Sequence, residues 1–389
     1  MNNLYEKGLP KNVLFQKLKT KLRQDSTYKS GRILGSMCTE PHSLAKRVYM
    51  QCLEKNLGDP YLFPATAELE QEVIQMFGSL LSNPNAHGHI VSGGTEANIL
   101  ALWTARNLAK RKKREIIASV SSHFSIDKAA DLLGLKLIKI GLNSRFQIDI
   151  KAVEESITSN TVAIIGNAGT TDLGVVDPIP ELSEIALTND IYLHVDAAFG
   201  GFVLPFLKNQ RLQAPAFDFR FSGIHSITID PHKMGFAPIP AGGILFRDSS
   251  IVEPIGMKVS YLAGGETNLT TLVGTRSGAS AIAVWALLMH LGRAGYEAVV
   301  KRCMKLTWML AEGVRQIDGV SLVTQPTINI VGIKSDVIDV QLITKELRKK
   351  GWAISRFPHH IRIVVMPHTK PSHIKAFLDD LREITKKLG

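Results

Sequence analysis

The feature that most constrains the fold of this chain is an alternation of short β-branched runs with amphipathic helical patterns between about residues 66 and 290. GHIV is followed by TEANILALWTARNLAK, EIIASV by SIDKAADLLG, and TVAIIG by IPELSEIALTN, and the runs IYLHVDAA, SITID and GGILF come next. Strands that alternate with helices form a mostly parallel sheet that is covered on both faces. The pattern therefore predicts an α/β fold with ligands beyond the carboxyl ends of the strands.

The segments on either side of this core have different patterns. Residues 1–65 are polar and are broken by glycines and prolines, so we expect an arm that packs on another surface. Residues 291–389 run helix, strand, helix, strand, helix, which predicts a smaller α+β domain. A chain of 389 residues, 45% of them hydrophobic, is long enough for two packed domains. We therefore expect an arm at 1–65, a large α/β domain at 66–290 and a small C-terminal domain at 291–389.

Composition and charge argue against several classes of protein. The longest apolar segment, AIAVWALLM from Ala281, is too short to span a bilayer, so we expect no membrane anchor. Cys38, Cys52 and Cys303 have no CxxC spacing, which favours a cytoplasmic protein without disulfides and without a metal site. The net charge of +11 includes the run KRKKR, Lys110 to Arg114. This run follows a helical pattern, so we interpret it as a solvated helix end and expect no nucleic-acid partner.

Four chemically distinctive features stand at expected strand ends. In SGGTEAN, Gly94 belongs to a tight turn and Thr95 opens a helix whose free N–H groups suit a phosphate. His123 follows EIIASV and can stack on a flat ring or move a proton. Asp196 ends a buried strand, where a carboxylate needs a cationic partner or hydrogen-bond donors. Lys233, in DPHKMGF, can form a Schiff base with a carbonyl cofactor.

Each of these features has an ordinary structural explanation when it is taken alone: a plain turn, a helix cap, a salt bridge and a surface lysine. Together they require one ligand that carries a phosphate, a ring with a basic nitrogen, and an aldehyde. Pyridoxal 5'-phosphate has all three groups. The glycine turn would take the phosphate, Asp196 would keep the pyridine nitrogen protonated, and Lys233 would bind the aldehyde.

The ordered motifs SGGTEAN, SSHFSIDKAA, NAGTTDLGVVDPI, YLHVDAAFGGFVLPF, DPHKMGFAPIPAGGILF and GTRSG resemble those of the group II pyridoxal-phosphate-dependent amino-acid decarboxylases. Within that family they are most similar to the archaeal L-tyrosine/L-aspartate decarboxylases, and the resemblance covers nearly the whole chain. It implies the aspartate-aminotransferase-like fold, called fold type I, with a large, mostly parallel seven-stranded sheet domain and a smaller C-terminal α+β domain. It also implies a homodimer whose active site lies near the subunit interface.

The resemblance implies a role for each residue that matches the family's motifs. The cofactor-binding set would be Gly94, Thr95, His123, Asn167, Thr171, Asp196, His232 and Lys233. Lys233 would form the Schiff base, His232 would help to hold the phosphate, and His123 would stack on the ring. Catalysis would use Lys233, His123 and Tyr261, with Tyr261 protonating the α-carbon. Arg276 of GTRSG would bind the substrate carboxylate.

The resemblance also implies a reaction, the loss of carbon dioxide from an L-amino acid. Aspartate would give β-alanine, a precursor of coenzyme A, and tyrosine would give tyramine for methanofuran. We favour aspartate slightly, and glutamate stays open.

Three alternatives to this reaction were considered. A sphingosine-phosphate-lyase-like aldolase shares SGGTEAN, GVVDPIPE and HVDAA. An aminotransferase is disfavoured by His123. A non-catalytic scaffold of the same fold would be expected to have lost Lys233 or Asp196.

Overall fold

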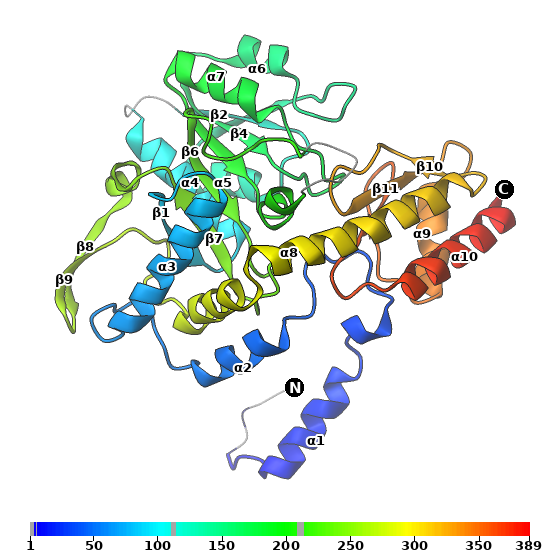
Figure 1. Ribbon diagram of the computed structural model, residues 1–389, viewed down its shortest axis with the longest axis horizontal. Helices are drawn as coiled ribbons and strands as arrows, with labels where there is room; N and C mark the ends of the chain where they lie inside the picture. Colours follow the sequence, from blue (N-terminus) through cyan, green and yellow to red (C-terminus); the bar gives the residue numbers. More distant parts are fainter. Residues whose placement is uncertain (1–3, 5, 110–113, 208–213) are drawn as a thin grey trace.

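A seven-stranded sheet forms the centre of the computed structural model, which describes residues 4, 6–109, 114–207 and 214–389 (Figure 1). The strand order is β1, β7, β6, β5, β4, β2, β3. The strands are β1 His87–Val91, β2 Glu115–Ser119, β3 Lys136–Ile140, β4 Thr161–Asn167, β5 Tyr192–Asp196, β6 Ile224–Ile229 and β7 Gly242–Phe246. Strands β2 to β6 pair in parallel, and β7 is antiparallel to β1 and β6. The mostly parallel seven-stranded sheet expected from the sequence is confirmed.

Helices cover both faces of this sheet because side chains alternate along each buried strand. Ile116 and Ala118 of β2 pack in one hydrophobic core with α4 Gly94–Leu108 and α5 Ser125–Leu133. Ile117, between them, packs in a second core that includes residues of α3 Pro64–Leu80 and α7 Ile179–Asn189. The helix α6 Ile150–Ser156 lies beside α7 (Figure 1). The carboxyl ends of the parallel strands therefore open at one edge, between the two helical layers.

A smaller antiparallel sheet forms the C-terminal part. Its order is β10 Ser321–Leu322, β11 Ile330–Lys334, β13 Ile361–Val364 and β12 Ser355–Arg356. The helices α9 Val340–Lys349 and α10 Pro371–Leu388 pack with it, and α8 Gly278–Arg315 reaches it from the large sheet (Figure 1). The helix α8 is interrupted at Gly292, where φ is 56°. The boundary expected at residue 290 thus falls inside α8, next to this interruption.

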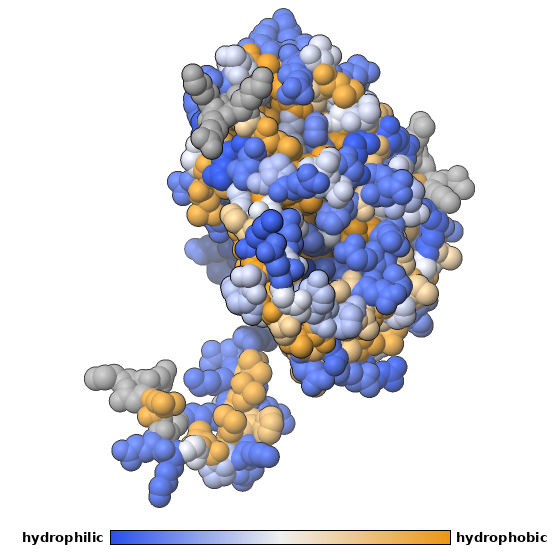
Figure 2. Space-filling model, turned by 90° about the vertical axis from the view of Figure 1, so that its left-hand side faces the viewer, coloured by the Kyte–Doolittle hydropathy of each residue, from blue (hydrophilic) through white to orange (hydrophobic). Residues whose placement is uncertain are grey.

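The first 65 residues do not form one uniform arm. Leu34 is buried among residues of the small sheet, and Ile33 forms a bridge to Ala353. The helix α2 Ser43–Gln51 packs on α8. The helix α1 Lys11–Leu22 has no buried residue, and it stands clear of the body with apolar side chains exposed (Figures 1 and 2).

The remaining elements are short. The hairpin of β8 Met257–Leu262 and β9 Gly265–Leu269 projects from the body near α3 (Figure 1). The 3₁₀ helices are η1 Tyr28–Ser30, η2 Gly200–Phe202, η3 Leu204–Phe206, η4 Ser249–Ile251 and η5 Glu253–Ile255. Residues 110–113 of the basic run lie outside the described residues. Among the helices that the structure describes, none is long and apolar enough to cross a membrane.

Candidate active site

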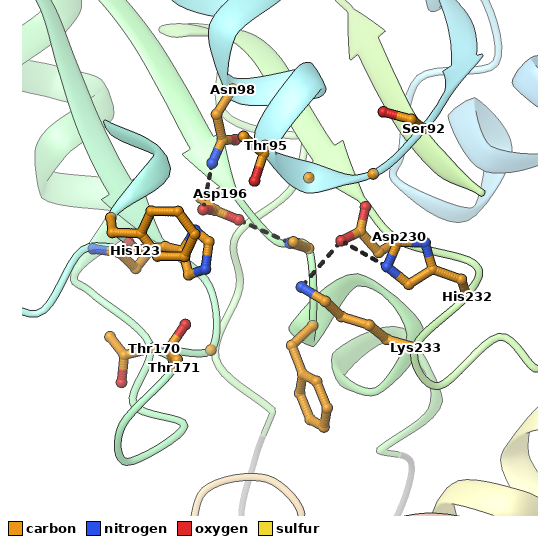
Figure 3. A pocket seen from close by; sticks show the side chains of 17 residues that line it. Ser92, Thr95, Asn98, His123, Thr170, Thr171, Asp196, Asp230, His232 and Lys233 are labelled. Atoms are coloured by element: carbon orange, nitrogen blue, oxygen red, sulfur yellow. Dashed lines mark hydrogen bonds and ion pairs between the residues drawn. The ribbon is translucent and has the colours of Figure 1, made fainter. Parts of the chain in front are cut away.

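A cavity of about 420 Å³ lies beyond the carboxyl ends of the parallel strands, where the sheet topology predicts a ligand site (Figure 3). All cofactor-binding residues predicted from the sequence line this one cavity, namely Gly94, Thr95, His123, Asn167, Thr171, Asp196, His232 and Lys233. They come from the first turn of α4, the β2–α5 turn, the end of β4, the end of β5 and the loop after β6. The structure thus brings together residues up to 139 positions apart, from Gly94 to Lys233.

The start of α4 forms one wall without side chains. Gly93 precedes the helix, and the helix begins at Gly94. A Cβ on Gly94 would lie 2.9 Å from Asp230 Oδ2, and a Cβ on Gly93 would lie 3.0 Å from His232 Cε1. Since the first N–H groups of an α-helix have no intrahelical acceptor, this wall offers donors and a positive dipole end. The wall is therefore suited to a phosphate group.

Lys233 lies across the cavity from the ring of His123 (Figure 3). Its Nζ is 3.0 Å from Asp230 Oδ2, while the other oxygen of Asp230 is buried without a partner among the described atoms. Burial alone would lower the pKa of Lys233, but the carboxylates of Asp230 and Asp196 outweigh it and raise the pKa above its ordinary value. This lysine must therefore give up a proton before it can act as a nucleophile.

Asp196 is a buried carboxylate at the end of β5. Its Oδ2 accepts a hydrogen bond of 2.8 Å from Asn98 Nδ2, and its Oδ1 accepts one of 3.0 Å from the N–H of Ala198. Within the described part of the chain it makes no ion pair. A buried carboxylate that lines a cavity and is oriented by two donors is suited to bind a protonated ring nitrogen.

His123 is held by the first turn of α5. Its Nδ1 lies 2.9 Å from Ser125 Oγ and 3.3 Å from the Ser125 N–H. Because the N–H can only donate, Nδ1 is an acceptor and the ring proton is on Nε2. Burial lowers the pKa of His123, and the charge of Asp196 opposes only part of this effect. The imidazole is therefore neutral at neutral pH.

The other predicted cofactor residues have contacts of their own. His232 Nδ1 accepts a hydrogen bond of 3.3 Å from the N–H of Ala241, and this orients the ring towards Gly93. Asn167 Nδ2 donates to Asp177 Oδ2 at 2.8 Å, so its amide group is held at the end of β4. These contacts fix the walls of the cavity before any ligand binds.

Two predicted site residues, Arg276 and Tyr261, do not line the main cavity of this chain. The guanidinium of Arg276 pairs with both carboxylate oxygens of Glu70 and donates to the carbonyl of Ile90. It lines a separate cavity of about 150 Å³, so its binding of a substrate carboxylate stays a prediction that requires a second subunit. Tyr261 is 85% exposed on β8 and does not line the main cavity. Its role as a proton donor stays a prediction that requires a second subunit.

Three residues in or beside the cavity were not given a function from the sequence alone. Asp230 lies within DPHK, and Asn98 lies within SGGTEAN, so both were visible only as parts of longer motifs. Arg362 is the second residue of β13, IRIV, and a charge within such an apolar run is a signal of its own. Arg362 donates 2.7 Å to the carbonyl of Thr171, a cavity residue, although it comes from the small sheet.

Fold and site together define the class of the protein: a pyridoxal-phosphate-dependent enzyme of fold type I. A glycine-walled helix start, a buried carboxylate, an imidazole and a lysine face one cavity of suitable chemistry. Solved structures share the architecture. The sphingosine-1-phosphate lyase of Burkholderia pseudomallei aligns with a TM-score of 0.93 and 29% identity, over 100% of this chain and 93% of that chain. The glutamate decarboxylase of Lactobacillus brevis aligns with a TM-score of 0.89 and 22% identity, over 100% and 95%.

Residues 35–335 match the family model described as the pyridoxal-dependent decarboxylase conserved domain, and the chain belongs to this family. It is 49% identical, over 98% of this chain and 99% of the relative, to an L-aspartate decarboxylase of Thermococcus kodakarensis. It is 51% identical, over 92% and 98%, to a probable L-tyrosine/L-aspartate decarboxylase of Methanothermobacter thermautotrophicus. The protein is thus a pyridoxal-phosphate-dependent amino-acid decarboxylase.

Proposed function

We propose that this enzyme decarboxylates L-aspartate to β-alanine, with L-tyrosine as a second substrate. The observation that carries the proposal is near-50% identity over almost the full length to relatives named as L-aspartate decarboxylases. A relative of Pyrococcus horikoshii, 50% identical, is named an L-aspartate/L-glutamate decarboxylase, so glutamate belongs in the same test. These names and the site residues support one chemical role, removal of the α-carboxyl group. The products fit coenzyme A biosynthesis for β-alanine and methanofuran biosynthesis for tyramine.

Each cavity residue has a place in this proposal. The start of α4, with Gly94, Thr95 and neighbouring His232, would hold the phosphate. Asp196 would hold the ring nitrogen, and Lys233 Nζ would bond the aldehyde carbon. When bound, the cofactor supplies a conjugated ring that accepts electrons from the substrate's α-carbon. The glycine wall supports this assignment, because a Cβ at Gly94 would enter the space of Asp230 and Ala198.

The residues must also decide which bond at the α-carbon breaks. Loss of carbon dioxide requires the carboxylate, and not the α-hydrogen, to be held out of the plane of the ring, which is a matter of positioning. His123 would stack on one face of the ring and keep its neutral Nε2–H group within the cavity. Lys233 Nζ would hold a proton when the substrate amine has taken its place. Asn167 and Thr171 would border the ring.

Arg362 is a second candidate, beside Arg276, for the group that binds the substrate carboxylate. Its terminal nitrogens donate to the carbonyls of Thr171 and Gly35, and its Nε is buried without a partner among the described atoms. Burial lowers the pKa of Arg362 to about 10, so it still carries its charge at neutral pH. Its charge also lowers the pKa of His123, although burial of that imidazole lowers it more.

We further propose a cytoplasmic homodimer. The three cysteines are free, which is typical of a reducing compartment. The helix α1 exposes Leu14, Phe15 and Leu18, and the β8–β9 hairpin exposes Met257, so both carry apolar groups suited to a second subunit. In this arrangement GTRSG and Tyr261 would approach the partner's cavity. The division into an arm at 1–65, a large domain at 66–290 and a small domain at 291–389 belongs to the same proposal.

A panel of amino acids tests the substrate. Purified enzyme is incubated with L-aspartate, L-glutamate and L-tyrosine, and carbon dioxide and the amine product are quantified. We expect β-alanine as the main product and no product from the Lys233→Ala variant. A phosphorylated amino alcohol is included because the lyase from Burkholderia pseudomallei shares the fold at 29% identity. Cleavage of that compound without carbon dioxide release from any amino acid would overturn the proposal.

A further inference from the structure

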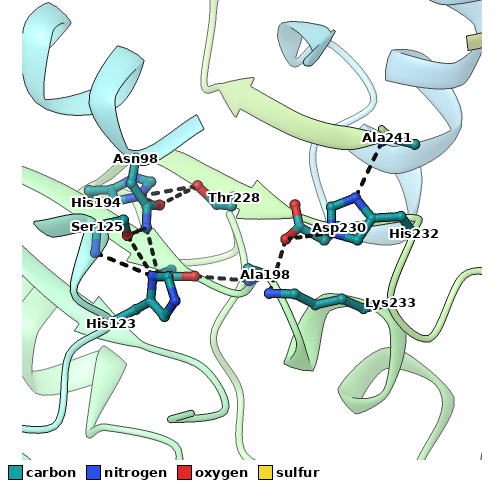
Figure 4. A network of polar contacts seen from close by, with 11 residues as sticks. Asn98, His123, Ser125, His194, Ala198, Thr228, Asp230, His232, Lys233 and Ala241 are labelled. Atoms are coloured by element: carbon teal, nitrogen blue, oxygen red, sulfur yellow. Dashed lines mark hydrogen bonds and ion pairs between the residues drawn. The ribbon is translucent and has the colours of Figure 1, made fainter. Parts of the chain in front are cut away.

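Asn98 is a buried side chain on α4 that uses all of its hydrogen-bonding groups (Figure 4). Its Nδ2 donates to Asp196 Oδ2 at 2.8 Å and to Ser125 Oγ at 2.9 Å. Its Oδ1 accepts from Thr228 Oγ1 at 2.8 Å and lies 2.9 Å from His194 Nε2. Asn98 therefore connects two strands of the sheet with the turn that carries His123.

The direction of these hydrogen bonds is fixed by Asp196, the acceptor at the end of the network. The carboxylate of Asp196 can only accept, so the amide nitrogen of Asn98 faces it and the amide oxygen faces His194. His194 Nε2 must then carry the proton, and Nδ1 accepts from Ser226 Oγ at 2.8 Å. Ser226 in turn accepts from the hydroxyl of Tyr192 at 2.8 Å. Every donor in this chain, from Tyr192 to Asn98, points towards Asp196.

The strand geometry explains how these groups meet. Tyr192, His194 and Asp196 alternate along β5, so they share the face of the sheet that α4 covers. Burial lowers the pKa of His194 to about 4, although the charge of Asp196 acts in the opposite direction. His194 therefore stays neutral across the neutral pH range and keeps one tautomer.

A second branch runs from the same amide to His123. Ser125 Oγ accepts from Asn98 Nδ2, so its own hydrogen is free to donate to His123 Nδ1, 2.9 Å away. This contact leaves the proton of His123 on Nε2. One amide group thus orients Asp196 and directs the Ser125 hydroxyl to His123 Nδ1, where the Ser125 N–H donates as well.

We propose that Asn98 is a positioning residue that holds Asp196 and His123 in their working orientation, and that His194 keeps Asn98 from turning over. The proposal rests on the proposed assignment of Asp196 and His123 to the cofactor. If His194 carried its proton on Nδ1, the amide of Asn98 could turn over and place its oxygen against the carboxylate of Asp196. The network opposes this, because the Tyr192 hydroxyl donates to Ser226 Oγ and leaves the Ser226 hydrogen to donate to His194 Nδ1.

The first test needs no variant and no cofactor. Nitrogen-15 NMR of histidine-labelled enzyme, prepared without cofactor, reports the tautomer of each imidazole. We expect His123 and His194 to carry the proton on Nε2 and to keep it there from about pH 6 to 8, in accord with their lowered pKa values. Observation of the Nδ1-protonated tautomer at either residue would overturn the proposal.

The second test compares variants in cofactor binding. Asn98→Leu keeps the size but removes the hydrogen bonds, and we expect about tenfold weaker pyridoxal phosphate affinity and a shifted cofactor absorption band. His194→Gln keeps a donor and an acceptor, so it should stay nearer to the wild type than His194→Phe does. The control is Thr104→Val, which removes a buried hydroxyl on α4 that bonds to the carbonyl of Leu100. This control should bind the cofactor like the wild type.

The variant Asp196→Ala distinguishes failure of the role proposed for Asn98 from failure of the cofactor assignment. If Asp196→Ala loses affinity and Asn98→Leu binds with the wild-type affinity and spectrum, the role of Asn98 is refuted and the cofactor assignment stands. If Asp196→Ala has no effect, the cofactor assignment itself fails. Should Asn98→Leu not fold by circular dichroism, Thr228→Val and Ser125→Ala each remove one contact of the network. An unchanged cofactor spectrum in both of these variants would also count against the proposal.

Discussion

At the residue scale, the chemistry depends on a lysine that is held as a cation. Lys233 is paired with Asp230 at 3.0 Å, and its pKa is raised despite burial, so the amine form is scarce at neutral pH and becomes more abundant as the pH increases. The covalent attachment of the cofactor needs the amine form. The ion pair therefore acts against attachment at neutral pH.

We predict that the rate of covalent attachment of pyridoxal phosphate to cofactor-free enzyme increases between about pH 7 and 9. In Asp230→Asn the same increase should occur at lower pH, because one of the two carboxylates that raise the pKa of Lys233 is lost. Stopped-flow absorbance measures both profiles. Asp127→Asn, which removes an exposed partner of Lys139, serves as the control and should not change the profile. Identical profiles for wild type and Asp230→Asn would contradict the prediction.

Single residues were predictable where a whole motif surrounded them. Lys233, Asp196 and His123 stand at strand ends, and the sheet topology brings such ends together regardless of their separation in sequence. The contact of Arg276 with Glu70 was not predictable, because no pattern in the sequence shows that these two side chains will pair. Arg362 was missed because its approach to the cavity depends on how the small sheet packs against the loop at Thr171.

At the scale of elements, the start of α4 is the proposed phosphate site. Gly94→Ala would place a methyl group 2.9 Å from Asp230 Oδ2 and 3.0 Å from Ala198 Cβ, so the wall must shift. We predict about tenfold weaker cofactor affinity with a folded protein, as overpacking of this kind is costly. Gly141→Ala is the matched control, because a Cβ there has no atom within 4 Å. Equilibrium dialysis measures both, and equal affinities in the two variants would refute the role of Gly94.

The elements themselves were largely predictable from periodicity. The runs EIIASV and TVAIIG are apolar on both faces, which is typical of parallel strands between two helical layers, and both form strands in the structure. The antiparallel direction of β7 was not predictable, because the apolar pattern of GGILF is compatible with either strand direction. The β8–β9 hairpin was not expected either, because GETNL is mostly polar and lacks an apolar alternation, and no residue of either strand is buried.

At the scale of the whole molecule, the exposed apolar face of α1 requires an explanation. Leu14 is 50% exposed and Leu18 is 46% exposed, one helical turn apart. We predict that the enzyme is a dimer by light scattering and that Leu14→Ser with Leu18→Ser weakens the dimer. Leu342→Ser, at a residue with 48% exposure on α9, is the control and should leave the dimer intact. A wild-type monomer with full activity would contradict the prediction.

The arrangement of the large and small sheets was predictable in outline, and its details were not. The order of strand and helix patterns indicated both parts. The packing of Leu34 on the small sheet could not be inferred, because a single buried leucine in a polar segment carries no periodicity. The interruption of α8 at Gly292 was likewise invisible in a continuous helical pattern.

The central claim is that the cofactor is bound covalently through Lys233. Enzyme loaded with pyridoxal phosphate is reduced with borohydride, digested, and analysed by peptide mass spectrometry. We predict one modified peptide, SITIDPHKMGF or a longer fragment around it, with the pyridoxyl group on Lys233, and no modification in Lys233→Ala. A pyridoxyl group on another lysine, or covalent labelling that persists in Lys233→Ala, would contradict the account.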